Sequence, residues 1–462
     1  MTNHKKIAYR GSIFYFRDSA NFANLPRADK TAGKEHYVYH EDGILIVEAG
    51  KVKDVGSYAD MKKKIDHIKI VDYTGKLITP GFIDTHQHAA QSAIVAAYGE
   101  KLLGWLDQYV FPSESTYRDP HIAKKELNFF LDQLLMNGTT TAVSYGPLFY
   151  EATDIFFEEL NRRKMRFITG NIMMDRNSPD TLCLSTQENY DIAKKLIKKW
   201  HNKGRLSFCL SPRFAISCSD KLLELCGSLK KEHPDLYIQT HLDENVNEIK
   251  EVKKLFPWSK NYLDVYDHFG LNDKRSVFGH CIHMTDPELE MLKKSHAVIS
   301  WCPISNNFLG SGLFNIENVT KYTTNITLGS DWGGGNTLSM FAVMDEAYKV
   351  SMLQNYKLAS MVRWFFATLG AARALQIDDK VGNFEIGKEA DFIVVDPAAT
   401  LYMRYRREKV TDIFELLFIL MTLGCDPNIH ATYIYGEPAY IKKEKQAVTV
   451  KVAHHKEKMT HK

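Results

Sequence analysis

The sequence predicts an α/β protein: a (β/α)8 TIM barrel with a small β-sandwich domain built from both ends of the chain. Two observations support this fold class. The middle of the chain alternates short apolar runs with amphipathic helical stretches, which is typical of parallel β-α units. Both ends contain short β-like runs punctuated by glycine. The 462 residues are enough for a barrel of about 250 residues together with a side domain.

Residues 1–79 are expected to form the N-terminal part of the small β domain. In this region Ile44-Leu45-Ile46-Val47 and Val52-Lys53-Asp54-Val55 flank the sequence Glu48-Ala49-Gly50-Lys51. Two apolar runs around a short glycine-containing turn predict a β-hairpin.

Residues 80–381 are expected to form the barrel. A helix is predicted where Ile122, Leu127, Phe130, Leu131, Leu134 and Leu135 recur at helical spacing, with Gly138 as its C-terminal cap. The apolar run before His86 is the first of eight strand candidates, and eight β-α units favour a closed barrel. The other seven are Thr139–Ser144, Phe167–Thr169, Leu206–Leu210, Leu236–Thr240, Val277–Phe278, Val298–Ser300 and Ile326–Leu328.

Residues 382–448 are expected to complete the small domain. Gly382–Gly387 and Ala390–Asp396 are predicted as short strands punctuated by glycine, and Tyr433–Gly436 as one more. Residues 449–462 are predicted to be a solvated basic tail.

Composition excludes several classes of protein. A content of 44% hydrophobic and 25% charged residues is that of a soluble globular protein. The net charge of +3 gives no strong field for nucleic acid or a membrane surface. There is no signal-peptide pattern and no apolar run of about 18 residues. Seven scattered cysteines, with no C-x-x-C pair, are typical of reduced thiols, so we expect a cytoplasmic protein.

Polar side chains follow four of the predicted strands. His86 and His88 lie two residues apart, and side chains at this spacing on a strand point to the same side. His241, His280 and Asp331 also come just after apolar runs. Each residue alone has an ordinary structural explanation, but their joint placement at strand ends favours a site. Nitrogen and oxygen ligands of this kind suit zinc or iron(II).

Glu244 lies three residues after His241, close enough to share its loop. A carboxylate beside a metal site can shuttle protons, provided that it is not itself a ligand.

These features resemble the amidohydrolase superfamily. The resemblance spans the chain from about Ile44 to about Tyr440 and includes Pro80–His88, His241, His280, Asp331 after Gly329-Ser330, and the closing segment Gly387–Asp396. Within the superfamily the chain resembles the bacterial-type guanine deaminases. The matching motifs are Tyr98-Gly99-Glu100, Leu103–Leu106, Phe111-Pro112, Asn137–Thr141, Met173–Asn177, Ser211–Phe214, Thr240–Asn245 and Leu309–Asn315.

The resemblance implies a zinc-dependent deamination of guanine to xanthine and ammonia, in guanine catabolism or salvage. One zinc ion, with iron(II) as the alternative, would be held by His86, His88, His241 and Asp331. His280 would lie beside the metal as a catalytic histidine or a further ligand. A single metal is favoured because Leu206–Phe214 lacks the bridging lysine of dinuclear members. The resemblance also implies a homodimer.

The substrate-binding residues that we expect are His88, Gln91, Trp105, Arg213, Phe214, His241, Glu244 and Asp331. Arginine is a donor-only fork that suits the O6 and N7 acceptors of guanine, and Arg213 could use this chemistry on the free base. Gln91 can both donate and accept. Phe214 and Trp105 are candidates to stack on the purine, whereas Phe111 is expected mainly to pack in the barrel.

The catalytic residues that we expect are Glu244, Asp331 and His280. Asp331 or His280 would help to generate the hydroxide that attacks C2 of guanine. Glu244 would protonate a ring nitrogen and then the leaving amine. Two alternatives stay open: a related enzyme that deaminates another purine, a pterin, cytosine or an s-triazine, and a scaffold without enzymatic activity. The cytidine-deaminase fold is excluded because its P-C-x-x-C signature is missing.

Overall fold

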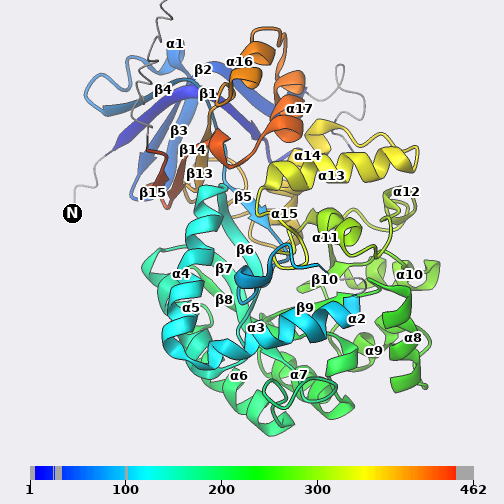
Figure 1. Cartoon of the computed structure of the whole chain (residues 1–462). Coiled ribbons are helices and arrows are strands. Elements are labelled where there is room, and N and C mark those ends of the chain that lie inside the picture. The colour runs from blue at the N-terminus through cyan, green and yellow to red at the C-terminus, as the bar shows by residue number, and fades with distance from the viewer. Residues whose placement is uncertain (1–5, 24, 26–33, 99–101, 444–462) are drawn as a thin grey trace, which may run out of the picture.

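The computed structural model describes residues 6–23, 25, 34–98 and 102–443 (Figure 1). Its larger part is a sheet of eight parallel strands that pair in chain order. All eight predicted strand positions are confirmed. The strands are β5 (Phe82–Asp84), β6 (Thr139–Gly146), β7 (Arg166–Met173), β8 (Leu206–Pro212), β9 (Tyr237–Leu242), β10 (Ser276–His280), β11 (Val298–Trp301) and β12 (Ile326–Leu328).

Hydrogen bonds between the first and last strands close this sheet into a barrel. The Thr85 amide donates to the Leu328 carbonyl at 3.2 Å, and the Asp331 amide donates to the His86 carbonyl at 2.8 Å. The Asp84 carboxylate accepts a further bond from the Ser330 amide at 3.0 Å. Closure therefore fixes the segment after β5 directly against the segment after β12.

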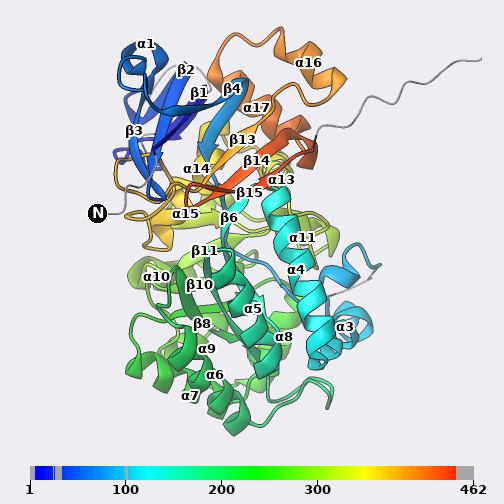
Figure 2. The same ribbon diagram turned by 90° about the vertical axis from the view of Figure 1, so that its left-hand side faces the viewer.

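Helices pack around the barrel, as Figures 1 and 2 show. The predicted helix after β5 is α4, and Gly138 beyond it has the left-handed φ of 81° expected of a C-terminal cap. Between β5 and α4 lie α2 (Leu102–Trp105), a π-helical turn (Leu106–Val110) and α3 (Phe111–Ser115). The helices that follow are α4 (Pro120–Met136), α5 (Tyr150–Arg162), α6 (Thr186–Trp200), α7 (Asp220–Glu232), α8 (Val246–Leu255), α9 (Tyr262–His268), α10 (Asp286–Ser295), α11 (Pro303–Phe308), α12 (Ile316–Val319), α13 (Met340–Leu353), α14 (Ser360–Phe366) and α15 (Leu369–Ala374).

The barrel interior changes from apolar to polar along the strands. Near the amino ends, seven of the strands contribute one residue each to an apolar layer that α15 covers; these residues are Ile83, Val143, Ile168, Cys209, Tyr237, Val277 and Val298. Towards the carboxyl ends, the Thr85 hydroxyl lies 2.6 Å from the Ser300 hydroxyl and 2.7 Å from the Thr327 hydroxyl. The apolar layer supports the fold, and the polar end is the one where barrel enzymes place their chemistry.

The strands from the two ends of the chain form the small domain. Its blue N-terminal strands lie beside orange and red C-terminal strands in Figure 2. The strands expected as a β-sandwich are hydrogen-bonded into one continuous seven-stranded sheet, in the order β15-β14-β13-β4-β1-β2-β3. The elements are β1 (Ile7–Phe16), β2 (Tyr37–Glu48), β3 (Lys51–Ser57), α1 (Tyr58–Met61), β4 (Lys69–Pro80), β13 (Phe392–Val395), β14 (Ile429–Ile434) and β15 (Glu437–Ile441).

The predicted hairpin between β2 and β3 is confirmed. Glu48 pairs with Lys51, and the two residues between them, Ala49 and Gly50, have φ values of 54° and 77°. Positive φ at both central positions is the two-residue turn that matches the twist of paired strands.

The strand expected at Gly382–Gly387 is wrong, because this segment forms bends and a turn. The C-terminal region also contains two unpredicted helices, α16 (Leu401–Arg407) and α17 (Ile413–Leu423), and α17 packs against α13 and α14 of the barrel. Residues 444–462, which include the predicted basic tail, lie outside the described residues.

A buried ionic cluster joins the small domain to the amino end of the barrel. Glu389 accepts hydrogen bonds from Arg166 at 2.5 and 2.8 Å and from Arg205 at 2.7 and 3.0 Å. Arg205 also pairs with Asp391, whose other oxygen accepts from the Tyr435 amide. The cluster therefore links β7 and the start of β8 to the loop before β13.

Among the described residues, no helix is both long and apolar enough to cross a membrane. All seven cysteines are described, and all are free thiols.

Candidate active site

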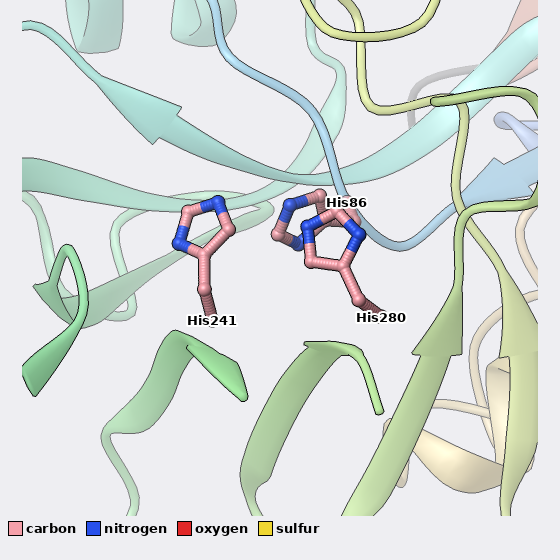
Figure 3. Close-up of side chains that lie close together, drawn as sticks. All are labelled: His86, His241 and His280. Carbon is pink, nitrogen blue, oxygen red and sulfur yellow. The ribbon is translucent and has the colours of Figure 1, made fainter. Parts of the chain in front are cut away.

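The predicted ligands meet at the carboxyl end of the barrel. His86 and His88 follow β5, His241 belongs to β9, His280 is the last residue of β10, and Asp331 follows β12. The rings of His86, His241 and His280 gather around a common space in Figure 3. Elements far apart in the sequence thus contribute one cluster of nitrogen and oxygen atoms.

The distances within this cluster suit a single metal ion. Nε2 of His88 lies 3.2 Å from Nε2 of His241. Oδ1 of Asp331 lies 3.3 Å from Nε2 of His88 and 3.5 Å from Nε2 of His86. Ligands about 2.0–2.1 Å from a tetrahedral zinc ion are themselves about 3.3 Å apart. These three distances suit ligands around one ion, and His86, His88 and Asp331 each offer an atom within 4.8 Å of the others.

Unpaired atoms in the same cluster also fit a bound cation. Nδ1 of His86 is buried without a hydrogen-bond partner among the described residues, and its Nε2 has only the Asp331 carboxylate, at 3.5 Å. A buried polar atom without a partner costs free energy, and ligation of an ion removes that cost.

The residues around the ligands orient their rings. Nδ1 of His241 lies 2.6 Å from the Arg213 carbonyl and 3.2 Å from the Tyr145 hydroxyl. A carbonyl can only accept, so Nδ1 carries the proton and Nε2 keeps its lone pair for a metal. The Tyr145 ring stacks on His88 at a centroid distance of 4.6 Å.

Gly279 leaves room for one of these rings. A Cβ atom at position 279 would lie 2.4 Å from Cε1 of His86. Only glycine lets β10 approach the histidine this closely.

His280 and Glu244 form a second group beside the ligands. Nε2 of His280 lies 3.3 Å from Oε2 of Glu244 and 3.9 Å from Oδ2 of Asp331. The Asn306 amide nitrogen lies 2.8 Å from Nδ1 of His280. With this amide as donor, the proton of the neutral ring is on Nε2 and faces the two carboxylates. The Ser311 hydroxyl donates to the other Glu244 oxygen at 3.0 Å.

Burial sets the protonation states in the site. It lowers the pKa of His88, lowers that of His241 well below the usual value, and lowers that of His280 to about 3. Neutral imidazole is the form that binds a metal. Burial would raise the pKa of Asp331, but its contacts with His86 and His88 hold that pKa well below the usual range.

Burial and then the charges of Glu248 and Asp331 raise the pKa of Glu244 well above its usual value. Glu244 is therefore suited to carry a proton.

A cavity opens beside the cluster. All eight residues expected to bind substrate lie in its wall. The lining residues are His88, Gln91, Leu102, Trp105, Leu106, Arg213, Phe214, His241, Glu244, His280, Leu309, Asp331 and Gly334. The wall combines apolar surface with a few polar groups, as is usual for small-molecule sites.

Two of the polar groups in the wall share a buried carboxylate. The Gln91 amide nitrogen donates to Oε1 of Glu114 at 2.8 Å, and Arg213 donates to Oε2 of Glu114 at 2.7 Å. The Arg213 guanidinium lies 5.4 Å above the centre of the Phe111 ring. Phe111 itself does not line the cavity, which agrees with the packing role expected for it.

Sequence reasoning missed four residues around the cluster: Glu114, Tyr145, Asn306 and Ser311. Glu114 lies three residues after the Phe111-Pro112 motif, and Ser311 lies within the Leu309–Asn315 motif. These two motifs could have drawn attention to them, but no spacing rule marks Tyr145 or Asn306. Gly99 and Glu100 of the Tyr98-Gly99-Glu100 motif lie outside the described residues.

Comparisons with known proteins agree with this geometry. The model of the amidohydrolase family matches residues 77–439. Guanine deaminase of Escherichia coli (strain K12) is 44% identical over 401 residues, which cover 87% of this chain and 91% of that protein. The solved structure of E. coli guanine deaminase has a TM-score of 0.90 at 40% identity and covers 95% of this chain and 100% of that chain. A guanine deaminase from C. acetobutylicum with guanine bound in its active site has a TM-score of 0.84 at 28% identity. The match covers 94% of this chain and 100% of that chain. This chain belongs to the amidohydrolase family.

Proposed function

We propose that this protein is a guanine deaminase that hydrolyses guanine to xanthine and ammonia, in guanine catabolism or salvage. The observation that carries the proposal is the cavity beside the metal-ligand cluster, in whose wall Gln91 and Arg213 lie together. The guanine deaminases among its relatives support the same substrate.

The polar wall of the cavity matches one edge of guanine. Guanine carries an acceptor, O6, next to a donor, N1–H. Arg213 supplies N–H donors for O6, and the amide oxygen of Gln91 can accept from N1–H. With this edge held, C2 and its amino group are left to face the ligand cluster. Phe214 supplies apolar surface for the purine ring. Trp105 adds a ring and a buried N–H that has no partner among the described residues.

We propose zinc as the metal, with iron(II) as the alternative, held by His86, His88, His241 and Asp331. When bound, zinc lowers the pKa of a water ligand to about 7, which supplies hydroxide at neutral pH. The proposed catalytic residues of the chain are Asp331, His280 and Glu244. Asp331 or His280 would help to generate the hydroxide, and protonated Glu244 would give its proton to a ring nitrogen of guanine. The proton released from water would then pass through Glu244 to the leaving amine.

We further propose two domains, with residues 1–79 and 382–448 in the small domain and residues 80–381 in the barrel. The change of sheet supports this division, since β4 ends at Pro80 and β5 begins at Phe82. A cytoplasmic location is supported by the seven free, scattered cysteines. The homodimer implied by the family resemblance can be checked by light scattering of the purified protein.

An assay of the metal-loaded protein tests the proposed function. Guanine is mixed with the protein, its ultraviolet absorbance is followed, ammonia is measured, and bound metal is counted. We expect loss of guanine with one equivalent of ammonia and about one metal ion per chain. Release of ammonia from another purine, a pterin or an s-triazine, but not from guanine, would instead select a related deaminase.

A further inference from the structure

The carboxylate of Glu114 lies behind the cavity wall, between Gln91 and Arg213. Each of its oxygens accepts one hydrogen bond. Oε1 accepts from the Gln91 amide, and Oε2 accepts from the Arg213 guanidinium. The Glu114 and Arg213 side chains are only 6% and 3% exposed. Glu114 itself does not line the cavity, so its effect on a ligand must pass through these two neighbours.

This contact fixes which end of the Gln91 amide faces Glu114. A carboxylate only accepts hydrogen bonds, so the Gln91 nitrogen must face it. The amide oxygen of Gln91 is then the free end, and it is buried without a hydrogen-bond partner among the described residues. A buried acceptor without a partner is costly, and a ligand that supplies a donor removes the cost.

The backbone at Gly333 holds the same amide from its other side. A Cβ atom at Gly333 would lie 1.9 Å from the Gln91 oxygen, so the amide packs directly against this glycine. Gly333 has a φ of 123°, a conformation that other residues rarely adopt. Gln91 is thus held between a carboxylate and a bare stretch of backbone.

We propose that Glu114 is a positioning residue that sets the hydrogen-bond polarity of the pocket and thereby its specificity for 6-oxopurines. It makes Gln91 present an acceptor and leaves the remaining N–H groups of Arg213 as donors. An acceptor beside donors matches N1–H and O6 of a 6-oxopurine. It opposes a purine in which N1 carries a lone pair and C6 carries no oxygen. The inference rests on the proposed function, because it concerns the same pocket.

Glu114→Gln is the sharpest test, because it keeps the size of the side chain and changes its hydrogen bonding. A glutamine at this position can still accept from Arg213 through its oxygen. Its nitrogen, however, must donate towards Gln91, which favours the reversed Gln91 amide with its own nitrogen free. The variant should therefore present a donor where the parent presents an acceptor.

Hypoxanthine and unsubstituted purine are the two probes, because neither carries the amine that the enzyme would remove. Hypoxanthine offers N1–H and O6, whereas purine offers a lone pair at N1 and no O6. Their dissociation constants are measured by calorimetry on metal-loaded protein. In the parent we expect hypoxanthine to bind at least ~10²-fold more tightly than purine, because purine leaves buried polar groups unpaired. In Glu114→Gln this ratio should fall at least ~10-fold, with the guanine kcat/KM reduced by about 10².

Two further variants separate a change in the hydrogen-bond polarity of the pocket from a general loss of ligand binding. Glu114→Asp keeps an acceptor-only side chain and should keep the hypoxanthine preference within about threefold of the parent, even where both ligands bind more weakly. Glu290→Gln removes a carboxylate from a surface ion pair with Lys293. It should leave both dissociation constants and the guanine kcat/KM unchanged. Unfolding midpoints and metal content show that each variant is folded and loaded.

The inference is overturned if folded Glu114→Gln keeps the parent's ratio of dissociation constants, or if the parent itself does not distinguish the two probes. Failure of the proposed function would look different, since the parent would then leave guanine intact whatever the binding ratio.

Discussion

Glu244 shows how a single side chain acquires its role from its surroundings. It is buried beside His280, with one oxygen held by Ser311. Burial and the neighbouring carboxylates raise its pKa well above the usual value, which favours the protonated acid. A carboxylic acid in this state can donate to a ring nitrogen, which an ordinary surface glutamate at pH 7 cannot do.

Replacing Glu244 by glutamine should abolish proton transfer while leaving the metal in place. General acid–base catalysis contributes about 10²–10⁴-fold, so kcat for guanine should fall by about 10³. Metal content should stay at the parent level, since Glu244 is not one of the four proposed ligands. The surface variant Glu251→Gln, which only breaks the pair with Lys254, is the control. A metal-loaded Glu244→Gln protein with parental turnover would refute this role.

Among single residues, the sequence predicts the clustering of the proposed ligands well and the residues behind them poorly. His86, His88, His241, His280 and Asp331 each follow an apolar run, and the barrel brings all such ends together. Glu114 belongs instead to a short helix between β5 and α4, where a glutamate looks like any surface residue. Its burial comes from contacts with Gln91 and Arg213 that no local pattern encodes.

Among the elements, the close approach of β10 to the segment after β5 has a direct consequence for metal binding. Gly279 lies against the His86 ring, and any side chain there must displace it. Overpacking of this kind costs about 1–3 kcal/mol.

Gly279→Ala should therefore weaken metal binding by about 10- to 100-fold, with a parallel loss of activity at limiting metal. Titration with a chelator, followed by metal analysis, measures this change. Gly104→Ala is a matched control, because a Cβ there meets nothing within 4 Å in an exposed part of α2. Equal metal affinity for Gly279→Ala and the parent would contradict the expected steric effect.

Periodicity explains which elements were predictable. The barrel strands are continuous apolar runs because both of their faces are covered, and their lengths suit strands. The helix α17 is apolar on nearly all sides, since α13 and α14 pack against it, and it shows no polar stripe that would mark a helix. The Gly382–Gly387 segment resembles a strand in composition but forms the turns that lead to the ionic cluster around Glu389.

At the scale of the whole molecule, Glu389 connects the two parts of the fold. Its carboxylate is 11% exposed and contacts both Arg166 and Arg205. Burial would raise its pKa, but the two arginines hold that pKa below the usual value of 4.5. The stabilisation from Glu389 is therefore complete above about pH 4.5 and is lost as the pH falls through its lowered folded-state pKa.

Glu389→Gln should leave two buried arginines poorly paired and lower the free energy of unfolding by about 3–5 kcal/mol at pH 7. Urea unfolding from pH 8 to pH 3.5 measures the difference between parent and variant. This difference should stay constant down to about pH 5 and shrink below about pH 4.5. Asp379→Asn changes only an exposed ion pair with Lys380, so its free energy of unfolding should equal that of the parent at every pH measured. A difference in the free energy of unfolding between parent and variant that grows at acid pH would show that Glu389 does not act through its charge.

The closure of the barrel also governs the order of events in folding. The hydrogen bond from Ser330 to Asp84 joins residues 246 positions apart, and the proposed ligands His86 and Asp331 flank this contact. Contacts between such distant residues form late, because a long loop must first be ordered. Nearly all of the barrel must therefore emerge from the ribosome and assemble before the four proposed ligands can share an ion. Bound metal would thus show that the first and last strands have come together.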